Sequence, residues 1–230
     1  MDRWRIARRA GAAFGIAIGV AGSYSRWFTP WQRNWGATAE ERERAMPGDP
    51  PGGQPAYFTT RAITVNAPAA AIYPWLVQIG KGRGGLYSYD FLDRLFGFLD
   101  APSSKDVLPE FQDLKPGDTI PLGRGADFPV LDLKRDEYLL LGDESEGTRW
   151  TWSTALYPQG DGTTRLVTRN TGDWGSSWTG RLMLIPMDLA AFIMVRRWLQ
   201  VLKGRAEQLH RQGMADGDPE TETEELAAAR

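Results

Sequence analysis

Cysteine is absent from this sequence of 230 residues, and there is one histidine, His210. Without cysteine the chain can form no disulfide, and it offers no thiolate to a metal ion or a substrate. One histidine excludes a metal site built from several imidazoles, and a Ser-His-Asp triad would need His210 itself. That residue lies at the far end of the last predicted helix, beside the tail, which is a poor position for catalysis. We assign no catalytic residue and predict neither a metal nor a cofactor.

A strong net charge is also lacking, because 27 basic and 29 acidic residues leave a formal charge of -2. This balance gives no general attraction to the phosphates of nucleic acid, so we predict no nucleic-acid partner. The charges are nevertheless segregated along the chain: four arginines fall within residues 1–9, whereas residues 214–230 carry six acids and one arginine. The acidic stretch indicates a solvated tail, and we predict that residues 213–230 are disordered.

Charged side chains are missing from Ala10–Tyr24, directly after the arginines. A helix of that length spans only ~22 Å, less than the ~30 Å of a bilayer core, but Trp27, Phe28 and Trp31 would extend it and suit a membrane interface. The short apolar run is equally typical of a cleaved signal peptide, and a buried helix is a third alternative. We predict that residues 1–34 are a membrane anchor or signal-like segment, with its arginines in the cytoplasm and the remaining chain outside.

Residues 35–56 form a predicted connector. Thr38 and Glu41 have the spacing of a capping box, which predicts a short helix from Ala39 to about Ala45. The prolines and glycines of "MPGDPPGGQP" then end that helix. The connector therefore leads from the N-terminal segment into a domain that we place at residues 57–212.

The pattern of residues 57–212 predicts an α+β domain. Alternating side chains predict a first strand. One face of this strand carries Phe58, Thr60, Ala62 and Thr64. The other face carries Arg61, Ile63 and Val65. Two short helices are predicted next, at about 69–79 and 88–98, followed by a meander of short antiparallel strands with tight turns over 118–173. The long helix predicted from Met187 to about Arg211 carries one apolar stripe: Phe192, Val195, Leu199, Leu202, Ala206 and Leu209. Such a stripe needs a broad apolar partner, which a curved sheet provides.

The glycines Gly80, Gly82 and Gly85 have the spacing of a dinucleotide-binding fingerprint. That motif must follow a strand and open a helix within a parallel βαβ unit. Here Gly80 ends a predicted helix, where a C-cap glycine belongs, and no parallel unit follows. We therefore predict no nucleotide, and we interpret the glycines as a tight elbow between the two short helices.

Five stretches carry a resemblance to a known family: "WGAT" at 35–38, "PGD" at 47–49, residues 59–97, "LPEFQDLKPGDTIPLG" at 108–123 and "LKGRAE" at 202–207. They are similar to the START/polyketide-cyclase (SRPBCC) superfamily, which includes the birch-pollen allergen, and more closely to an uncharacterised bacterial branch with members that have an N-terminal membrane segment. The resemblance implies the helix-grip fold, in which a curved antiparallel sheet surrounds a long C-terminal helix and leaves a cavity for an apolar ligand. It also implies that the anchor lies in the bacterial cell membrane; export after signal-peptide cleavage is the alternative.

Eight residues are predicted to bind the ligand: Trp75, Arg83, Tyr87, Tyr89, Trp150, Trp152, Arg169 and Trp198. The tryptophans would form the cavity wall, although a filled core would use them equally well. Arg83 would orient a carboxylate or phosphate head group near the elbow, unless it only forms an ion pair with Asp90 or Asp93. Arg169 is either a buried charge or a surface arginine paired with an acid.

Binding or carriage of a small hydrophobic or amphipathic ligand, lipid-like or polyketide-like, is therefore the predicted function, and an enzyme is not the favoured class. The alternative is a cavity enzyme of the cyclase/dehydratase type, which would use Arg83, a tyrosine and one aspartate as acid or base. The candidate aspartates are Asp90, Asp93, Asp132 and Asp173. A third class is a membrane-associated structural domain with a filled core.

Overall fold

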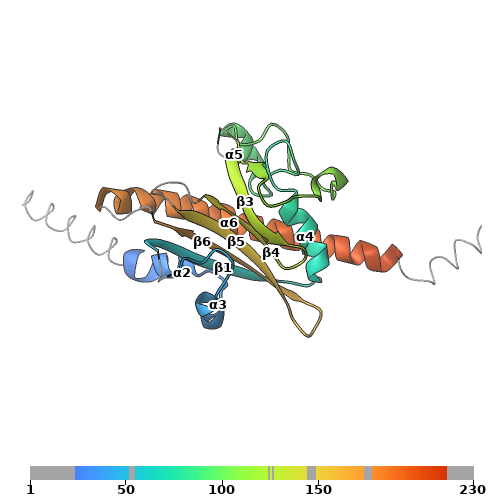
Figure 1. Cartoon of the computed structure of the whole chain (residues 1–230), viewed down its shortest axis with the longest axis horizontal. Helices are drawn as coiled ribbons and strands as arrows, with labels where there is room; N and C mark the ends of the chain where they lie inside the picture. Colours follow the sequence, from blue (N-terminus) through green and yellow to red (C-terminus); the bar gives the residue numbers. More distant parts are fainter. Residues whose placement is uncertain are drawn as a thin grey trace, which may run out of the picture.

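In the computed structural model, the described residues are 24–51, 55–123, 125, 127–143, 149–173 and 178–216 (Figure 1). They contain one antiparallel sheet of six strands in the order β1-β6-β5-β4-β3-β2. The strands are β1 (Tyr57–Val65), β2 (Thr119–Pro121), β3 (Asp127–Lys134), β4 (Tyr138–Asp143), β5 (Trp150–Pro158) and β6 (Thr164–Gly172). The helices are η1 (Tyr24–Phe28), α2 (Thr29–Arg33), α3 (Ala39–Glu43), α4 (Ala69–Val77), α5 (Asp90–Leu95), η2 (Pro109–Phe111) and α6 (Trp178–Asp216).

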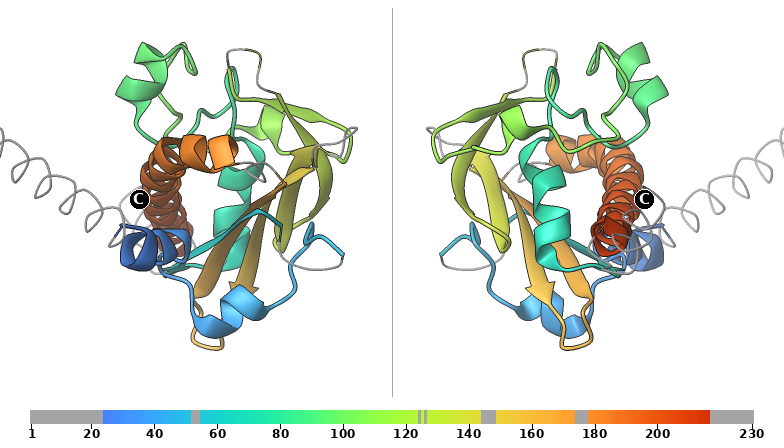
Figure 2. Two further views of the ribbon diagram at one scale, coloured as in Figure 1. Left: turned by 90° about the vertical axis from the view of Figure 1, so that its left-hand side faces the viewer. Right: turned by 90° about the vertical axis from the view of Figure 1, so that its right-hand side faces the viewer.

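The long helix α6 and the shorter α4 lie on the same side of the curved sheet, whereas α3 lies on the other side (Figure 2). The predicted apolar stripe of α6 is the face that is covered, since Leu199, Leu202 and Ala206 have no exposed surface. Burial of one apolar face of a helix on a sheet is the main gain that such a layer offers. The α+β helix-grip class is confirmed, and α6 extends beyond the predicted Met187–Arg211 at both ends.

The central strands alternate between a face that points toward α6, here called the inner face, and an outer face. In β5, Trp150 and Trp152 lie on the inner face, opposite Gly172 and Asn170 of β6. In β1, Arg61 also lies on the inner face, where it is 1% exposed. The period of two predicted for β1 is therefore confirmed, and β5 has the same alternation.

The connector is fastened to the outer face of the sheet by two arginines of β6. Arg169 donates hydrogen bonds to the backbone carbonyls of Glu41, Arg42 and Arg44 at 2.8, 3.1 and 2.9 Å, and it pairs with Asp49 at 2.7 Å. Arg165 pairs with both carboxylate oxygens of Glu41 at 2.7 Å. We call this group of contacts the outer clasp.

Helix α3 begins at the predicted capping box. The Thr38 hydroxyl accepts from the Glu41 backbone N–H at 3.1 Å, and the Glu41 carboxylate accepts from the Thr38 N–H at 2.8 Å. Burial alone would raise the pKa of Glu41, but its bonds to Arg165 and to Thr38 hold that pKa below the usual value. The helix ends at Glu43, two residues before the predicted end.

The glycine elbow closes on itself. The Gly80 N–H donates to the Gly85 carbonyl at 2.9 Å, and the Gly85 N–H donates to the Gly80 carbonyl at 3.1 Å. Gly80 has a φ of 131° and Gly85 a φ of 96°, and a Cβ on Gly85 would lie 2.6 Å from the Ser103 Cα. Both the backbone conformation and the close approach require glycine, as expected for a tight elbow. The second short helix, α5, is shorter than the predicted 88–98.

The ends of the chain differ from the predicted boundaries. Most of the predicted membrane segment, residues 1–23, lies outside the described residues. Its last part forms η1 and α2, and α2 packs against β1 and α6. Within the described ranges there is no helix long and apolar enough to cross a membrane. Helix α6 continues to Asp216, so residues 213–216 are helical rather than part of the predicted tail, and residues 217–230 lie outside the described part.

Candidate functional site

Two adjoining pockets lie between the inner face of the sheet and α6. The first, here called the Arg61 pocket, has a volume of about 330 Å³ and is lined by Tyr57, Arg61, Phe128, Trp150, Asn170, Met187, Asp188, Ala191 and Val195. The second, the Trp198 pocket, has a volume of about 290 Å³ and is lined by Ile79, Leu86, Ser88, Leu122, Phe128, Trp152, Asn170, Ala191, Met194, Val195 and Trp198. Four residues line both pockets, so we treat the two as one cavity.

Aromatic side chains form the sheet side of this cavity. The Phe128 ring lies 4.6 Å from the Trp150 ring and 6.0 Å from the Trp152 ring, and Trp152 meets Trp198 of α6 edge-on at 5.2 Å. The Trp152 indole N–H donates to the Thr168 hydroxyl at 2.8 Å, which fixes the orientation of the ring. Flat apolar walls with few polar groups are typical of sites for small apolar molecules.

The far end of the Arg61 pocket is polar and centres on Asp188 of α6, which is 3% exposed. One carboxylate oxygen of Asp188 accepts from the Tyr57 hydroxyl at 3.0 Å. The other accepts from the Gln32 amide at 3.1 Å and from the Arg33 Nε at 2.7 Å. The α2, β1 and α6 elements thus meet at a single buried carboxylate.

Arg61 lies beside this carboxylate without a full pairing to it. Its Nε donates to the Gln32 carbonyl at 2.9 Å, whereas its Nη2 is 3.6 Å from the nearest Asp188 oxygen. That Nη2 is buried and has no hydrogen-bond partner among the described residues. Burial lowers the pKa of the Arg61 guanidinium, but arginine stays protonated in proteins.

The polar groups at this end are a protonated tyrosine hydroxyl, a multiply bonded carboxylate and two guanidinium groups. Burial, reinforced by the Asp188 charge, raises the pKa of Tyr57 to about 12, so its hydroxyl stays protonated at neutral pH and acts as a donor. Asp188 already accepts from three donors, which leaves it poorly placed as a general base. Two arginines and one aspartate give this end a net positive charge.

Arg83 does not reach the cavity wall in the way that we predicted. Its guanidinium donates to the carbonyls of Val77 at 2.8 Å and Ile79 at 3.1 Å, and it lies 4.5 Å from the centre of the Phe111 ring. It therefore covers the carbonyl end of α4. The predicted ion pair with an aspartate is also wrong. The Asp90 carboxylate accepts from Ser103 instead, and Asp93 accepts from the hydroxyl of Ser88.

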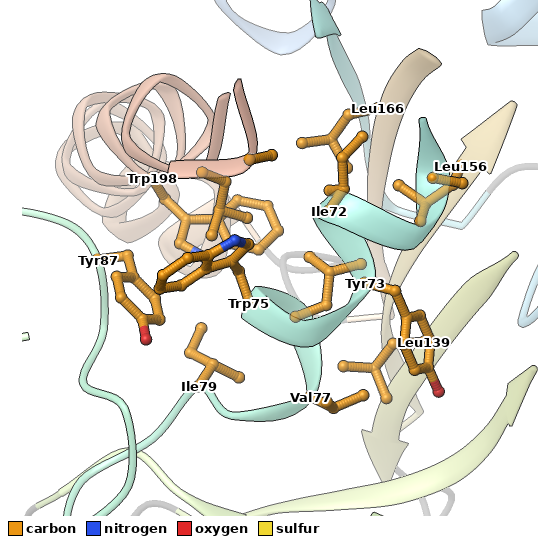
Figure 3. Packing of buried hydrophobic residues seen from close by; sticks show 14 of the residues in the cluster. Ile72, Tyr73, Trp75, Val77, Ile79, Tyr87, Leu139, Leu156, Leu166 and Trp198 are labelled. Carbon is orange, nitrogen blue, oxygen red and sulfur yellow. The ribbon is translucent and has the colours of Figure 1, made fainter. Parts of the chain in front are cut away.

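Three other predicted site residues lie elsewhere, and a fourth lies in a separate groove. Trp75 and Tyr87 belong to the core, where their rings meet edge-on at 5.9 Å (Figure 3). Arg169 is a buried charge, which was one of its two predicted alternatives, but it belongs to the outer clasp and not to the cavity. Tyr89 lines a third hollow of about 200 Å³ between α5 and α6, with Arg197 over its ring at 5.7 Å. Only Trp150, Trp152 and Trp198 of the predicted set line the main cavity.

The polar end of the cavity was missed. Asp188 is the single charged residue between Leu182 and Val195, and Arg61 shares its strand face with Ile63 and Val65. A lone charge on an apolar face marks a group that must find a buried partner. This signal could have identified both residues, although not their pairing.

A curved antiparallel sheet around a long helix, with an apolar cavity between them, defines the helix-grip fold, as the resemblance implied. No protein-family model and no curated protein matches the sequence.

Solved structures with low similarity include DynU16, a protein in the dynemicin biosynthetic locus, at 17% identity and a TM-score of 0.37, covering 65% of this chain and 48% of that one. The chain thus spans about half the length of DynU16. CalU16 from Micromonospora echinospora is 15% identical with a TM-score of 0.32, covering 66% of this chain and 85% of that one. A hypothetical protein from Helicobacter pylori is 12% identical with a TM-score of 0.42, covering 71% of this chain and 96% of that one.

Proposed function

We propose that this protein binds or carries a small hydrophobic or amphipathic molecule, lipid-like or polyketide-like, in the cavity between the sheet and α6. The observation that carries the proposal is the wall formed by Phe128, Trp150, Trp152 and Trp198, which contact one another ring to ring. Each of the two pockets approaches or exceeds the lower end of the ~300–1,000 Å³ found for small-molecule sites. The cavity is therefore large enough for a ligand, and a filled core is not the favoured reading.

The cyclase-type alternative has less support. It assigned the chemistry to Arg83, whose guanidinium is bound by backbone carbonyls, to a tyrosine and to one of four aspartates, none of which lines the main cavity. Asp93 lines the separate groove between α5 and α6, where burial raises its pKa. Asp188 does line the main cavity, but three donors occupy its oxygens. Carriage needs none of these groups to exchange a proton.

Binding of a neutral fluorescent dye tests the proposal. N-phenyl-1-naphthylamine should bind the protein with increased emission, and the double variant Trp150→Ala/Trp152→Ala should lose this binding because the aromatic wall is gone. The matched control is Trp27→Ala, which removes an indole that is 74% exposed. Native mass spectrometry after mild extraction should also show a co-purifying lipid-like species. Unchanged dye affinity in the double variant would refute the location, and apo protein that binds no dye would refute carriage.

We also propose that the chain associates with a bacterial membrane through its N-terminal segment, with the domain outside the cytoplasm. Trp27 and Trp31, which lie in the last part of that segment, are 74% and 51% exposed, and tryptophan is favoured at membrane interfaces. Fractionation of cells that express the full chain with a C-terminal tag should find it in the membrane pellet, or outside the cytoplasm if the segment is cleaved. Recovery of the tagged chain in the cytosol alone would overturn this proposal.

A further inference from the structure

We propose that the ligand of this cavity carries a carboxylate, and that Arg61 binds it at the polar end of the Arg61 pocket. The inference rests on the proposed function, since it assigns one end of the same cavity to the head group of the bound molecule. It goes further by naming the chemical class: an apolar body with a single negatively charged oxygen group.

The first observation is an unused donor. Arg61 is 1% exposed and lines the pocket, yet its Nη2 makes no hydrogen bond to any described residue. Buried N–H groups of charged side chains are nearly always bonded, because water can no longer compensate them. An oxygen of a ligand in the adjoining pocket is a natural partner for this donor once the guanidinium adjusts toward it.

The second observation is that Asp188 pairs closely with Arg33 but only loosely with Arg61. Arg33 takes one oxygen of Asp188 at 2.7 Å, Tyr57 takes the other at 3.0 Å, and Arg61 remains 3.6 Å away. Two guanidinium groups thus face one carboxylate, and the less closely paired of the two is in the cavity wall. A second carboxylate, supplied by the ligand, balances the charge and forms a charge-assisted hydrogen bond.

The third observation is the path that leads away from Arg61. Phe128, Asn170 and Val195 line both pockets, so the cavity continues from the polar end toward the Trp152 and Trp198 rings. A ligand with its head at Arg61 would place its apolar body along this aromatic wall. Both a straight-chain acid and a fused aromatic acid have this arrangement, and the shared feature is one carboxylate at one end.

Paired acids and methyl esters test the proposal, because an ester keeps the apolar body and removes the charge. Displacement of N-phenyl-1-naphthylamine is measured with decanoic acid against methyl decanoate, and with 2-naphthoic acid against methyl 2-naphthoate. We expect at least one acid to bind about ten to a hundred times more tightly than its ester, as one charge-assisted hydrogen bond provides. The pair that shows the larger ratio distinguishes a fatty-acid ligand from an aromatic one.

Variants then assign the preference to Arg61. Arg61→Met should bring the affinity for the acid down to that for the ester, whereas Asp188→Asn should keep the preference, because it leaves Arg61 without a competing carboxylate. Arg165→Met is the matched control, since it removes an arginine from the opposite face of the same sheet and should leave the ratio unchanged.

The outcomes separate the two proposals. Equal binding of acid and ester to the wild-type protein would overturn the carboxylate proposal while carriage still stands, and this comparison needs no variant to fold. Failure of all four compounds and of the dye to bind would refute carriage itself. A full acid preference in a folded Arg61→Met protein would remove Arg61 from the site.

Discussion

Loss of the Arg169 guanidinium should release the connector from the sheet. This side chain is 1% exposed and makes five hydrogen bonds, three of them to the connector carbonyls of Glu41, Arg42 and Arg44. Hydrogen bonds to a charged group contribute about 1.5–3 kcal/mol each, so the three bonds to the connector carbonyls sum to an upper limit of roughly 9 kcal/mol. Asp49 is 26% exposed and regains water easily. The limit is not reached, because the connector can detach and hydrate its carbonyls while the sheet stays folded.

We therefore expect Arg169→Met to lower the free energy of unfolding by about 3–4 kcal/mol, close to the cost of breaking a buried charged cluster. Urea denaturation measures this loss. Trypsin provides a local readout, because Arg42 and Arg44 lie in or beside α3, and cleavage there should become at least about tenfold faster once the segment opens. Arg135→Met, at a position where the side chain is 83% exposed, should change stability by less than about 0.5 kcal/mol. A loss below about 1 kcal/mol for Arg169→Met, with unchanged cleavage, would show that the outer clasp does not hold the connector.

Two further predictions concern the elbow and the buried tyrosine. Gly85→Ala places a Cβ 2.6 Å from the Ser103 Cα, whereas Gly82→Ala meets open space at a similar positive φ. In urea denaturation the Gly85→Ala variant should therefore be less stable than the Gly82→Ala variant by at least about 2 kcal/mol. Equal stabilities of the two variants would contradict the tight elbow. The pKa of Tyr57 is raised to about 12 in the folded protein, against ~10 when unfolded, so its stabilisation is complete below pH ~10 and is lost as the pH rises toward 12. Tyr57→Phe lacks this ionisation, and between pH 10 and 12 its Tm should fall less than that of the wild type; parallel decreases would rule out the perturbed hydroxyl.

The parts of the fold that local periodicity encodes were predictable. The stripe of α6 and the alternation of β5 depend only on which side chains recur at a fixed spacing, and this spacing places Leu202 on the covered face of α6 and Trp150 and Trp152 on one face of β5. The capping box at Thr38 is equally local. These patterns also placed two of the three predicted residues that line the cavity, because the inner face of a strand is the face that meets the helix.

The site predictions that were wrong or missing concern residues whose partners cannot be recognised from the sequence. Arg83 next to three glycines looks the same whether it contacts a ligand or a set of backbone carbonyls, and the carbonyls of Val77 and Ile79 carry no residue-specific signal. Asp188 and Gln32 are 156 residues apart in the chain, so only the folded structure brings them together. Long-range contacts of this kind need either the structure or covariation between homologues.

The outer clasp lies on the face of the sheet opposite to the cavity. Arg165 and Arg169 fasten one face, while Trp150 and Trp152 shape the cavity on the other. Substitutions that reshape the cavity therefore leave these outer contacts in place, while the apolar packing between the sheet and α6 is what they change. The outer contacts give the sheet a second source of cohesion, so substitutions on the cavity side can accumulate in small steps without a new fold at each one.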